Sequence, residues 1–145
     1  MAERPTRVDY VHWEQVTTRW ADIDVYGHMN NARYFEIIDT VVNNHMARAL
    51  GVDIRTLPVV GVVAEVGCRY FAEVGYPAPV DVGLRVERIG TSSIIYTIGI
   101  FQGPGDEAAA EGRFVHVYVD NTDPARPVTP IPDVIRAAVE PLVRA

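Results

Sequence analysis

A single long amphipathic segment, beginning near residue 31, limits the architectures open to this chain. From Tyr34 onward, apolar side chains recur at spacings of three and four residues, the period of an α-helix with one buried face. Asn30 or Asn31 is a suitable N-cap, and Gly51 is a suitable C-terminal stop. We therefore predict a helix over 31–50, about 30 Å long at about 1.5 Å per residue.

After this helix the apolar pattern changes to a period of two, which predicts β-strands. Turn-forming glycine and proline residues separate the strands, and such short connections favour antiparallel hairpins. The predicted strands are 8–18 before the helix, then 64–74, 80–88, 92–102 and 112–120. The side chains expected on buried faces include Ile94, Tyr96, Ile98 and Ile100, and also Cys68, Val115, Val117 and Val119.

The order of these elements predicts an α+β fold in one domain, 1–145. Only the helix is long enough to cover the apolar face of the sheet, so we expect an antiparallel five-stranded sheet wrapped around one central helix. A proline-rich extended tail follows, and a short C-terminal helix over about 132–143 ends the chain. A chain of 145 residues is long enough to bury a substantial core.

Composition narrows the functional classes. A net charge of −6 argues against a partner such as duplex nucleic acid, and no apolar run reaches membrane-spanning length. Cys68 is the single cysteine, which excludes an internal disulfide, and the N-terminal segment lacks a secretory signal. All 13 basic residues are arginine, so lysine Schiff-base chemistry is excluded. We expect a cytoplasmic protein with neither a membrane nor a nucleic-acid partner.

The richest cluster of polar side chains lies directly before the helix. It comprises Asp22, Asp24, Gly27, His28, Asn30 and Asn31. A helix start presents unpaired N–H groups and the positive end of the helix dipole, which together stabilise negative charge. A carboxylate beside such donors can attack a polarised carbonyl or activate water for that attack.

The two carboxylates of this cluster have different expected roles. Asp24 lies about six residues before the N-cap, too far to cap the helix itself, and we predict that it is catalytic. Asp22 is predicted to be a turn or surface carboxylate. Asn30 and Asn31 should form the helix start, and any functional part they have lies in their backbone N–H groups. Tyr34 is predicted to be a core residue that could also line a pocket beneath Asp24.

His28 has two open interpretations. It either orients the loop and contacts substrate, or it is a hydrogen-bonded structural residue. Asp22, Asp24 and His28 are possible metal ligands by type, but no repeated histidine or cysteine accompanies them, so we expect no metal. The remaining histidines, His12, His45 and His116, are predicted to be structural.

The run from Asp22 to Tyr34, together with the element order, resembles the hotdog-fold acyl-CoA thioesterases, in particular the 4-hydroxybenzoyl-CoA thioesterase-like family. The resemblance implies that Asp24 is the catalytic carboxylate, acting as nucleophile or general base. It also implies that a backbone N–H near Asn31 polarises the thioester carbonyl. Gly27, His28, Asn30 and Tyr34 then belong to the same substrate-binding region.

The same resemblance implies a homodimer, or a dimer of dimers forming a homotetramer, with active sites where the subunits meet. Coenzyme A would be part of the substrate, and no separate cofactor is expected. One or two of the arginines on the strands could hold its phosphates; the candidates are Arg69, Arg85 and Arg113. Two alternatives stay open: a hotdog enoyl-CoA hydratase and a non-catalytic module that binds acyl-CoA.

Overall fold

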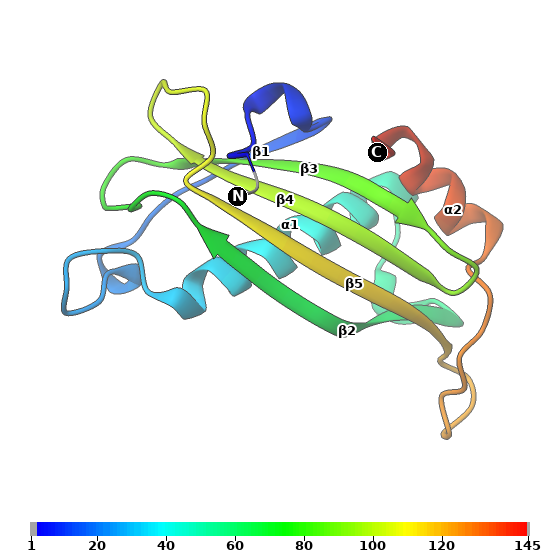
Figure 1. Ribbon diagram of the computed structural model, residues 1–145. Helices are drawn as coiled ribbons and strands as arrows, with labels where there is room; N and C mark the ends of the chain where they lie inside the picture. Colours follow the sequence, from blue (N-terminus) through cyan, green and yellow to red (C-terminus); the bar gives the residue numbers. More distant parts are fainter. Residues whose placement is uncertain (1–2, 145) are drawn as a thin grey trace.

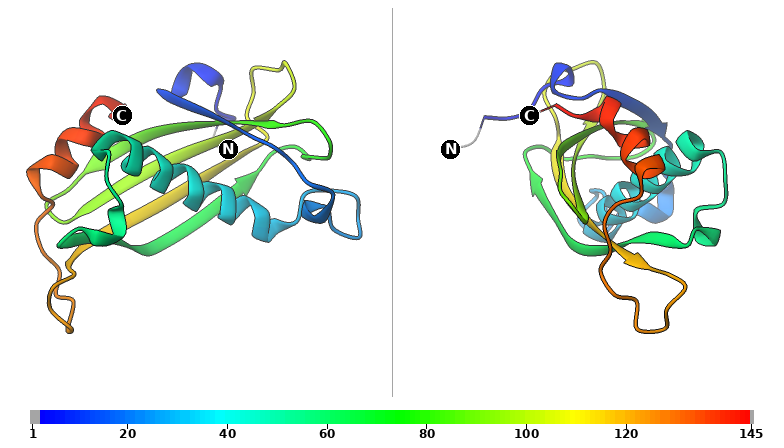
Figure 2. Two further views of the ribbon diagram at one scale, coloured as in Figure 1. Left: turned by 180° about the vertical axis from the view of Figure 1, so that it is seen from behind. Right: turned by 90° about the vertical axis from the view of Figure 1, so that its right-hand side faces the viewer.

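A computed structural model, which describes residues 3–144, contains one curved sheet and two α-helices (Figure 1). The elements in chain order are β1 (His12–Val16), α1 (Asn31–Leu50), β2 (Val59–Tyr70), β3 (Val80–Ile89), β4 (Ser93–Gln102), β5 (Ala110–Asp120) and α2 (Asp133–Val139). All strand pairs are antiparallel, and the strand order is β1-β3-β4-β5-β2. The sheet curls around α1, as the two further views show (Figure 2). The predicted hotdog architecture is confirmed.

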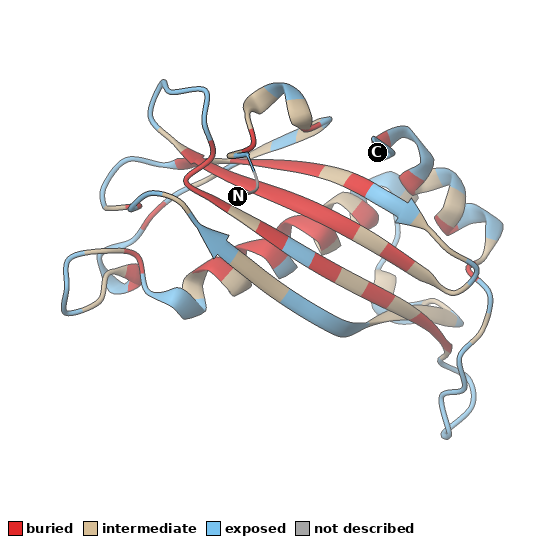
Figure 3. Cartoon of the chain, viewed as in Figure 1, coloured by how far each residue is buried: buried red, intermediate tan, exposed pale blue. Residues whose placement is uncertain are grey.

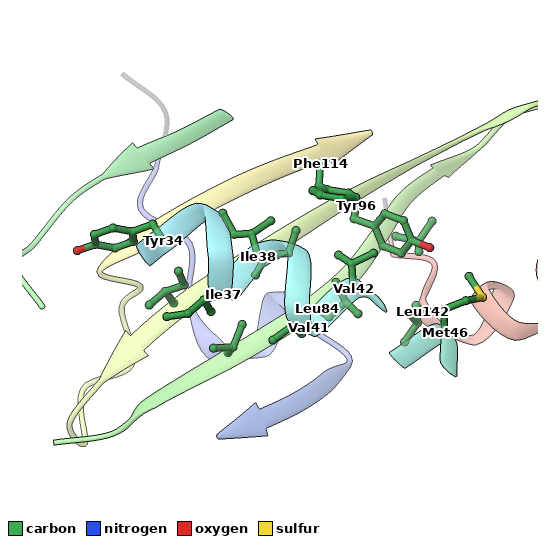
Figure 4. Close-up of a cluster of buried hydrophobic side chains, with 14 of the residues drawn as sticks. Tyr34, Ile37, Ile38, Val41, Val42, Met46, Leu84, Tyr96, Phe114 and Leu142 are labelled. Atoms are coloured by element: carbon green, nitrogen blue, oxygen red, sulfur yellow. The ribbon is translucent and has the colours of Figure 1, made fainter. Parts of the chain in front are cut away.

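Helix α1 has the predicted bounds because its two ends are encoded locally. The side chain of Asn30 accepts a hydrogen bond from the backbone N–H of Ala32 at 2.9 Å. At the other end Gly51 adopts φ +68°, a left-handed conformation that glycine reaches without strain, and donates its N–H to Ala47 at 2.8 Å. The apolar stripe of the helix is buried against the sheet (Figure 4).

The core lies between α1 and the concave face of β3 and β4, where burial is most complete (Figure 3). The predicted buried faces of these strands are confirmed by Val80, Val82, Leu84 and Val86 in β3, and by Ile94, Tyr96, Ile98 and Ile100 in β4. The prediction for β5 is confirmed for the burial of Val119, which is 5% exposed, and was wrong for Val115 and Val117, which are half-buried. The core-facing side chains of β5 are Phe114, His116 and Tyr118. Both faces of β5 carry residues that favour strands, and the larger aromatic rings fill the space beside the helix.

Strand β1 is shorter than the predicted 8–18, because a 3₁₀ turn, Arg7–Asp9, precedes it. After this turn Tyr10 lies on the outer face of the sheet and is 4% exposed. Its hydroxyl donates a hydrogen bond to Glu111 at 2.6 Å. The ring fits because Gly83 and Gly99 have no side chains; a Cβ at Gly99 would lie 2.4 Å from the Tyr10 ring.

Strand β2 begins and ends earlier than the predicted 64–74, and it is an edge of the sheet. Its register against β5 shifts between Val63 and Glu65, which breaks the alternation seen in the sequence. Cys68 packs against the edge of the core, as predicted, although it is only half-buried. The expected C-terminal helix is α2, continued by a 3₁₀ turn, Glu140–Leu142. Within the described residues, no helix combines the length and hydropathy needed to cross a bilayer.

Candidate active site

The loop that enters α1 is organised around Asp22, which is 2% exposed. Its carboxylate accepts hydrogen bonds from the Arg19 backbone N–H at 2.8 Å and from Arg19 Nε and Nη2 at 2.9 and 2.7 Å. The Nε atom of Arg33, in α1, lies 3.2 Å from Asp22 Oδ2. The predicted place in a turn is confirmed, because Asp22 ends the 3₁₀ turn Trp20–Asp22. The predicted surface exposure was wrong, because folding brings two arginines from different segments onto this side chain. Asp22 is therefore a structural anchor for the helix start.

Asp24 lies in a tight turn with Gly27 at its corner. The turn is closed by hydrogen bonds from Asp24 N to His28 O at 2.9 Å and from Gly27 N to Asp24 O at 3.1 Å. Gly27 has φ +84°, a conformation that side-chain-bearing residues rarely adopt. The Oδ1 atom of Asp24 accepts from the N–H groups of Tyr26 at 2.8 Å and His28 at 3.3 Å. Within residues 3–144, Oδ2 accepts no hydrogen bond, so one oxygen is anchored while the other is available.

The first turn of α1 presents a free donor near this loop. Asn30 donates its N–H to Asp22 O at 2.7 Å, and its own oxygens accept from the N–H groups of Ala32 and Arg33 at 2.9 Å each. The N–H of Asn31 has no acceptor among the described residues. The Asn31 side chain accepts a hydrogen bond from the Tyr70 hydroxyl, which joins the end of β2 to the start of α1.

Tyr34 lies one turn further along the helix and is 5% exposed. Its ring packs edge-on against Tyr70, with the centroids 4.9 Å apart. Burial, followed by the nearby charges of Cys68 and Asp24, raises the pKa of Tyr34 to about 12. The phenol is therefore neutral at pH 7. Burial also raises the pKa of the Cys68 thiol, which disfavours the thiolate needed for nucleophilic attack.

His28 connects the loop to the segment after β2. Its Nε2 lies 3.0 Å from Glu73 Oε2, and the neighbouring Met29 donates its backbone N–H to Val74 O at 2.8 Å. The His28 side chain is 44% exposed, so its second nitrogen is not committed to the core. This geometry fits a residue that orients the loop, and it leaves contact with substrate open. Within the described part of the chain, no three histidine, cysteine, aspartate or glutamate side chains gather as a metal site would require.

The candidate arginines lie elsewhere, on the outer face of the sheet. They line a cavity of about 450 Å³ that does not include Asp24. Arg69 pairs with Glu111 at 2.6 Å, and Arg113 pairs with Glu65 at 2.5 Å. Arg85 donates to the Arg144 carbonyl oxygen at 2.7 Å. The structure thus brings these arginines together but pairs two of them with carboxylates, which leaves little net positive charge for phosphates.

A second cavity, of about 340 Å³, also excludes Asp24 and lies at the other end of α1. Sequence reasoning missed it, because its walls come from five separate elements. His116 is the signal that could have indicated it: a polar side chain at an inward-facing position of an otherwise apolar sheet face. The residues predicted before the helix therefore do gather in one place, while neither of these two cavities includes Asp24.

The sequence and fold were compared with known proteins. The chain is similar in structure to the PA5185 protein from Pseudomonas aeruginosa strain PAO1, with 40% identity, TM-score 0.92 and 99% of each chain covered. It is also similar to the PA2801 protein from Pseudomonas aeruginosa, for which thioesterase activity is proposed, with 32% identity, TM-score 0.77 and coverage of 90% of this chain and 98% of that one.

The fold alone is shared with the 1,4-dihydroxy-2-naphthoyl-CoA thioesterase Slr0204 from Synechocystis, at 14% identity and TM-score 0.78, with coverage of 88% of this chain and 93% of that one. No curated protein matches the sequence. The family model of the thioesterase-like superfamily matches residues 18–139, which include the whole polar loop, α1 and all strands after it. The chain belongs to the thioesterase-like superfamily.

Proposed function

We propose that this protein hydrolyses an acyl-CoA thioester to the free acid and coenzyme A, with Asp24 as the catalytic residue. The observation that carries the proposal is the Asp24 carboxylate: two backbone N–H groups fix one oxygen, and the other accepts no hydrogen bond from the residues that the structure describes. Such a group is held in orientation while keeping a lone pair for attack on a carbonyl or for accepting a proton from water. Membership of the thioesterase-like superfamily supports the same reaction class.

The helix start supplies the second requirement, a donor for the oxyanion. In the proposed mechanism the free N–H of Asn31 binds the thioester carbonyl oxygen, and the positive end of the α1 dipole adds to its effect. A donor of this kind contributes about 10²–10³ in rate, or roughly 3–4 kcal/mol. Tyr34, neutral and buried, forms the apolar floor beneath the reacting atoms, and His28 and Gly27 keep the Asp24 turn closed.

We further propose that two copies associate through β2, as a homodimer or as one half of a dimer of dimers. β2 is an edge strand with unpaired backbone groups, and Val63, Val66 and Tyr70 along it are 50%, 40% and 48% exposed. A two-fold axis through the middle of this strand would pair it with itself in antiparallel orientation. The seam would then run past Tyr70 and the start of α1. Sedimentation of the protein as a monomer at micromolar concentration would contradict this arrangement.

The test of the chemistry is replacement of Asp24 by asparagine. Short, long and aromatic acyl-CoA thioesters are offered to the wild-type protein, and the released thiol is measured with a thiol reagent. For the best substrate, Asp24→Asn should lower kcat/KM by at least about 10², because the group acts in the transition state. Asp39→Asn is the matched control, since Asp39 is an exposed carboxylate on α1, outside the Asp24 loop, whose loss should leave activity unchanged.

Three results would contradict the proposal. One is near-full activity of Asp24→Asn. Another is loss of enoyl-CoA absorbance without release of thiol, which indicates a hydratase. The third is tight binding of acyl-CoA with no turnover of any thioester, which indicates a binding module.

A further inference from the structure

The outer face of the sheet, which is turned toward the viewer in Figure 1, contains a hollow of about 450 Å³. At one end of this face the ring of Tyr10 lies over Gly83 and Gly99, and the hollow opens beyond it. Small residues such as Gly67 and Thr97 form part of its lining. The charged residues of its walls come from β2, β3 and β5: Glu65, Arg69, Arg85, Glu87, Glu111 and Arg113.

The charges of this hollow balance, because it holds three arginines and three glutamates. Arg69 contacts Glu111 at 2.6 Å, and Arg113 contacts Glu65 at 2.5 Å. The side chains of Arg113 and Glu65 remain 46% and 64% exposed, so both can take a further partner. A face on which opposite charges alternate without a net charge is complementary to a copy of itself, whereas a polyanion or a polycation would meet as much repulsion as attraction.

An apolar row lies beside these charges on the outer face. In β5, Val115 and Val117 alternate with the core-facing Phe114 and His116 and therefore point outward. Ile95 of β4 lies opposite Val115 in the strand register. All three side chains are only partly buried, although a sheet face that meets water usually carries polar residues at such positions. The outer face thus combines apolar and balanced charged residues, as interfaces between protein chains do.

The pairing through β2 that we proposed above would double this face. The two-fold axis would pass near the middle of β2, close to Glu65, and the two outer faces would form one continuous surface. Arg113 lies one strand further from the axis, opposite Gly67 in the register. If a second pair of chains packs on this surface through its own outer face, the assembly closes with D₂ symmetry. The four Glu65 carboxylates then meet at the centre, with the four Arg113 guanidinium groups around them.

We propose that the partner of the outer face is a second β2-paired dimer, so that the protein is a tetramer in which two sheets pack back to back. Sheets packed face to face lie about 10 Å apart, close enough for the long side chains of one to enter the hollow of the other. Ion pairs between Arg113 and Glu65 hold the centre, and the row of Ile95, Val115 and Val117 is covered. The proposal rests on the β2 pairing proposed above, but it does not depend on thioester hydrolysis.

Reversal of charge at the centre tests this interface. Arg113→Glu leaves only negative charges there, and Glu65→Arg leaves only positive ones. In sedimentation velocity, at a concentration at which the wild type is a tetramer, each variant alone should therefore be a dimer. When the two variants are mixed in equal amounts, tetramers should form again, because a negative face then meets a positive one. Recovery on mixing distinguishes a contact between dimers from a loss of folding within the chain.

Asp39→Arg is the matched control, because it changes the charge as much as Glu65→Arg does. Asp39 is exposed on α1, which covers the other face of the sheet, so this variant should remain a tetramer. Ile95→Arg is a second test that alters no ion pair. It places a charge in the apolar row and should give dimers, and it decides the matter if a charge-reversal variant fails to fold.

The outcomes separate the two proposed contacts. Sedimentation of the wild type as a dimer would overturn the back-to-back contact and leave the β2 pairing standing, whereas a monomer would overturn both. Tetramers that survive Arg113→Glu or Ile95→Arg, dimers that persist after the two charge variants are mixed, or loss of the tetramer in Asp39→Arg would each overturn the proposal. None of these results depends on whether thioesters are hydrolysed.

Discussion

Replacing Asp22 by asparagine tests whether burial is what makes the carboxylate before α1 important. The change removes one negative charge and nearly preserves the shape of the side chain. Asp22 accepts hydrogen bonds from the backbone and side chain of Arg19 and lies 3.2 Å from Arg33 Nε. Removing one partner of a buried ion pair costs about 3–5 kcal/mol, because the other charge is left without compensation.

The exposure of the two arginines sets the size of the effect. The Arg19 side chain is 59% exposed and can be hydrated when its partner is lost, whereas that of Arg33 is 16% exposed and cannot. We therefore expect Asp22→Asn to lower the free energy of unfolding by about 2–4 kcal/mol, slightly below the range for a fully buried pair. Urea unfolding at pH 7, followed by tryptophan fluorescence at one fixed protein concentration, measures this loss.

Asp53→Asn is the matched control, because Asp53 makes the same kind of fork with Arg55 at the surface. The Arg55 side chain is 87% exposed, and an exposed pair contributes at most about 1 kcal/mol. If the two variants lose the same stability, the reasoning from burial is refuted.

The acid dependence of the Asp22 contribution has a definite sign. Burial opposes ionisation of Asp22, but hydrogen bonds from Arg19 and the charge of Arg33 outweigh it, so the pKa lies below its ordinary value. The contribution is therefore complete above the unfolded-state pKa of about 3.9 and is lost as the pH falls through the lower folded-state value. The stability gap between wild type and Asp22→Asn should narrow in the same acid range.

Two further predictions concern the helix start and the cavity. Asn30→Ala should lower the free energy of unfolding by about 1 kcal/mol because the N-cap is lost, whereas Asn30→Asp should keep most of the cap's contribution. Urea unfolding midpoints measure both changes, and equal losses would contradict the capping role. His116 has a pKa of about 4, below its ordinary value, so its contribution to stability is complete above about pH 6.5 and falls as the pH drops towards 4. Between pH 7 and pH 5 the wild type should therefore lose roughly 1–2 kcal/mol more than His116→Phe, and equal losses would show that His116 is not buried as a neutral ring.

Features encoded over a few neighbouring residues could be predicted from the sequence. Helix α1 has the predicted bounds because Asn30 and Gly51 act on adjacent backbone groups, and its stripe repeats with the helix period. The inward faces of β3 and β4 follow from apolar residues at every second position, from Val80 to Val86 and from Ile94 to Ile100. The clustering of the polar residues before the helix follows from their short separation along the chain.

Features that depend on distant segments could not be predicted. The burial of Asp22 depends on Arg33, which is eleven positions later on the helix and contacts the Asp22 carboxylate. The inward face of β5 depends on the space beside α1, since valines and aromatic residues occupy opposite faces of the same strand. The cavity around His116 needs walls from five elements, so the histidine alone could be interpreted only as structural.

Tyr10 packs against Gly83 and Gly99 on the outer face of the sheet, and this contact determines how much of the amino terminus can be removed. Glu3 is exposed, so a cleavable tag can be joined before it. Removing Arg4 and Pro5 as well would break two hydrogen bonds to Ala108. Arg4 Nε donates to Ala108 O at 2.8 Å, and Ala108 N donates to Pro5 O at 2.8 Å. A truncation that takes Tyr10 as well would open Phe101 and Ala108 to water, and the shortened protein would tend to aggregate through this uncovered patch.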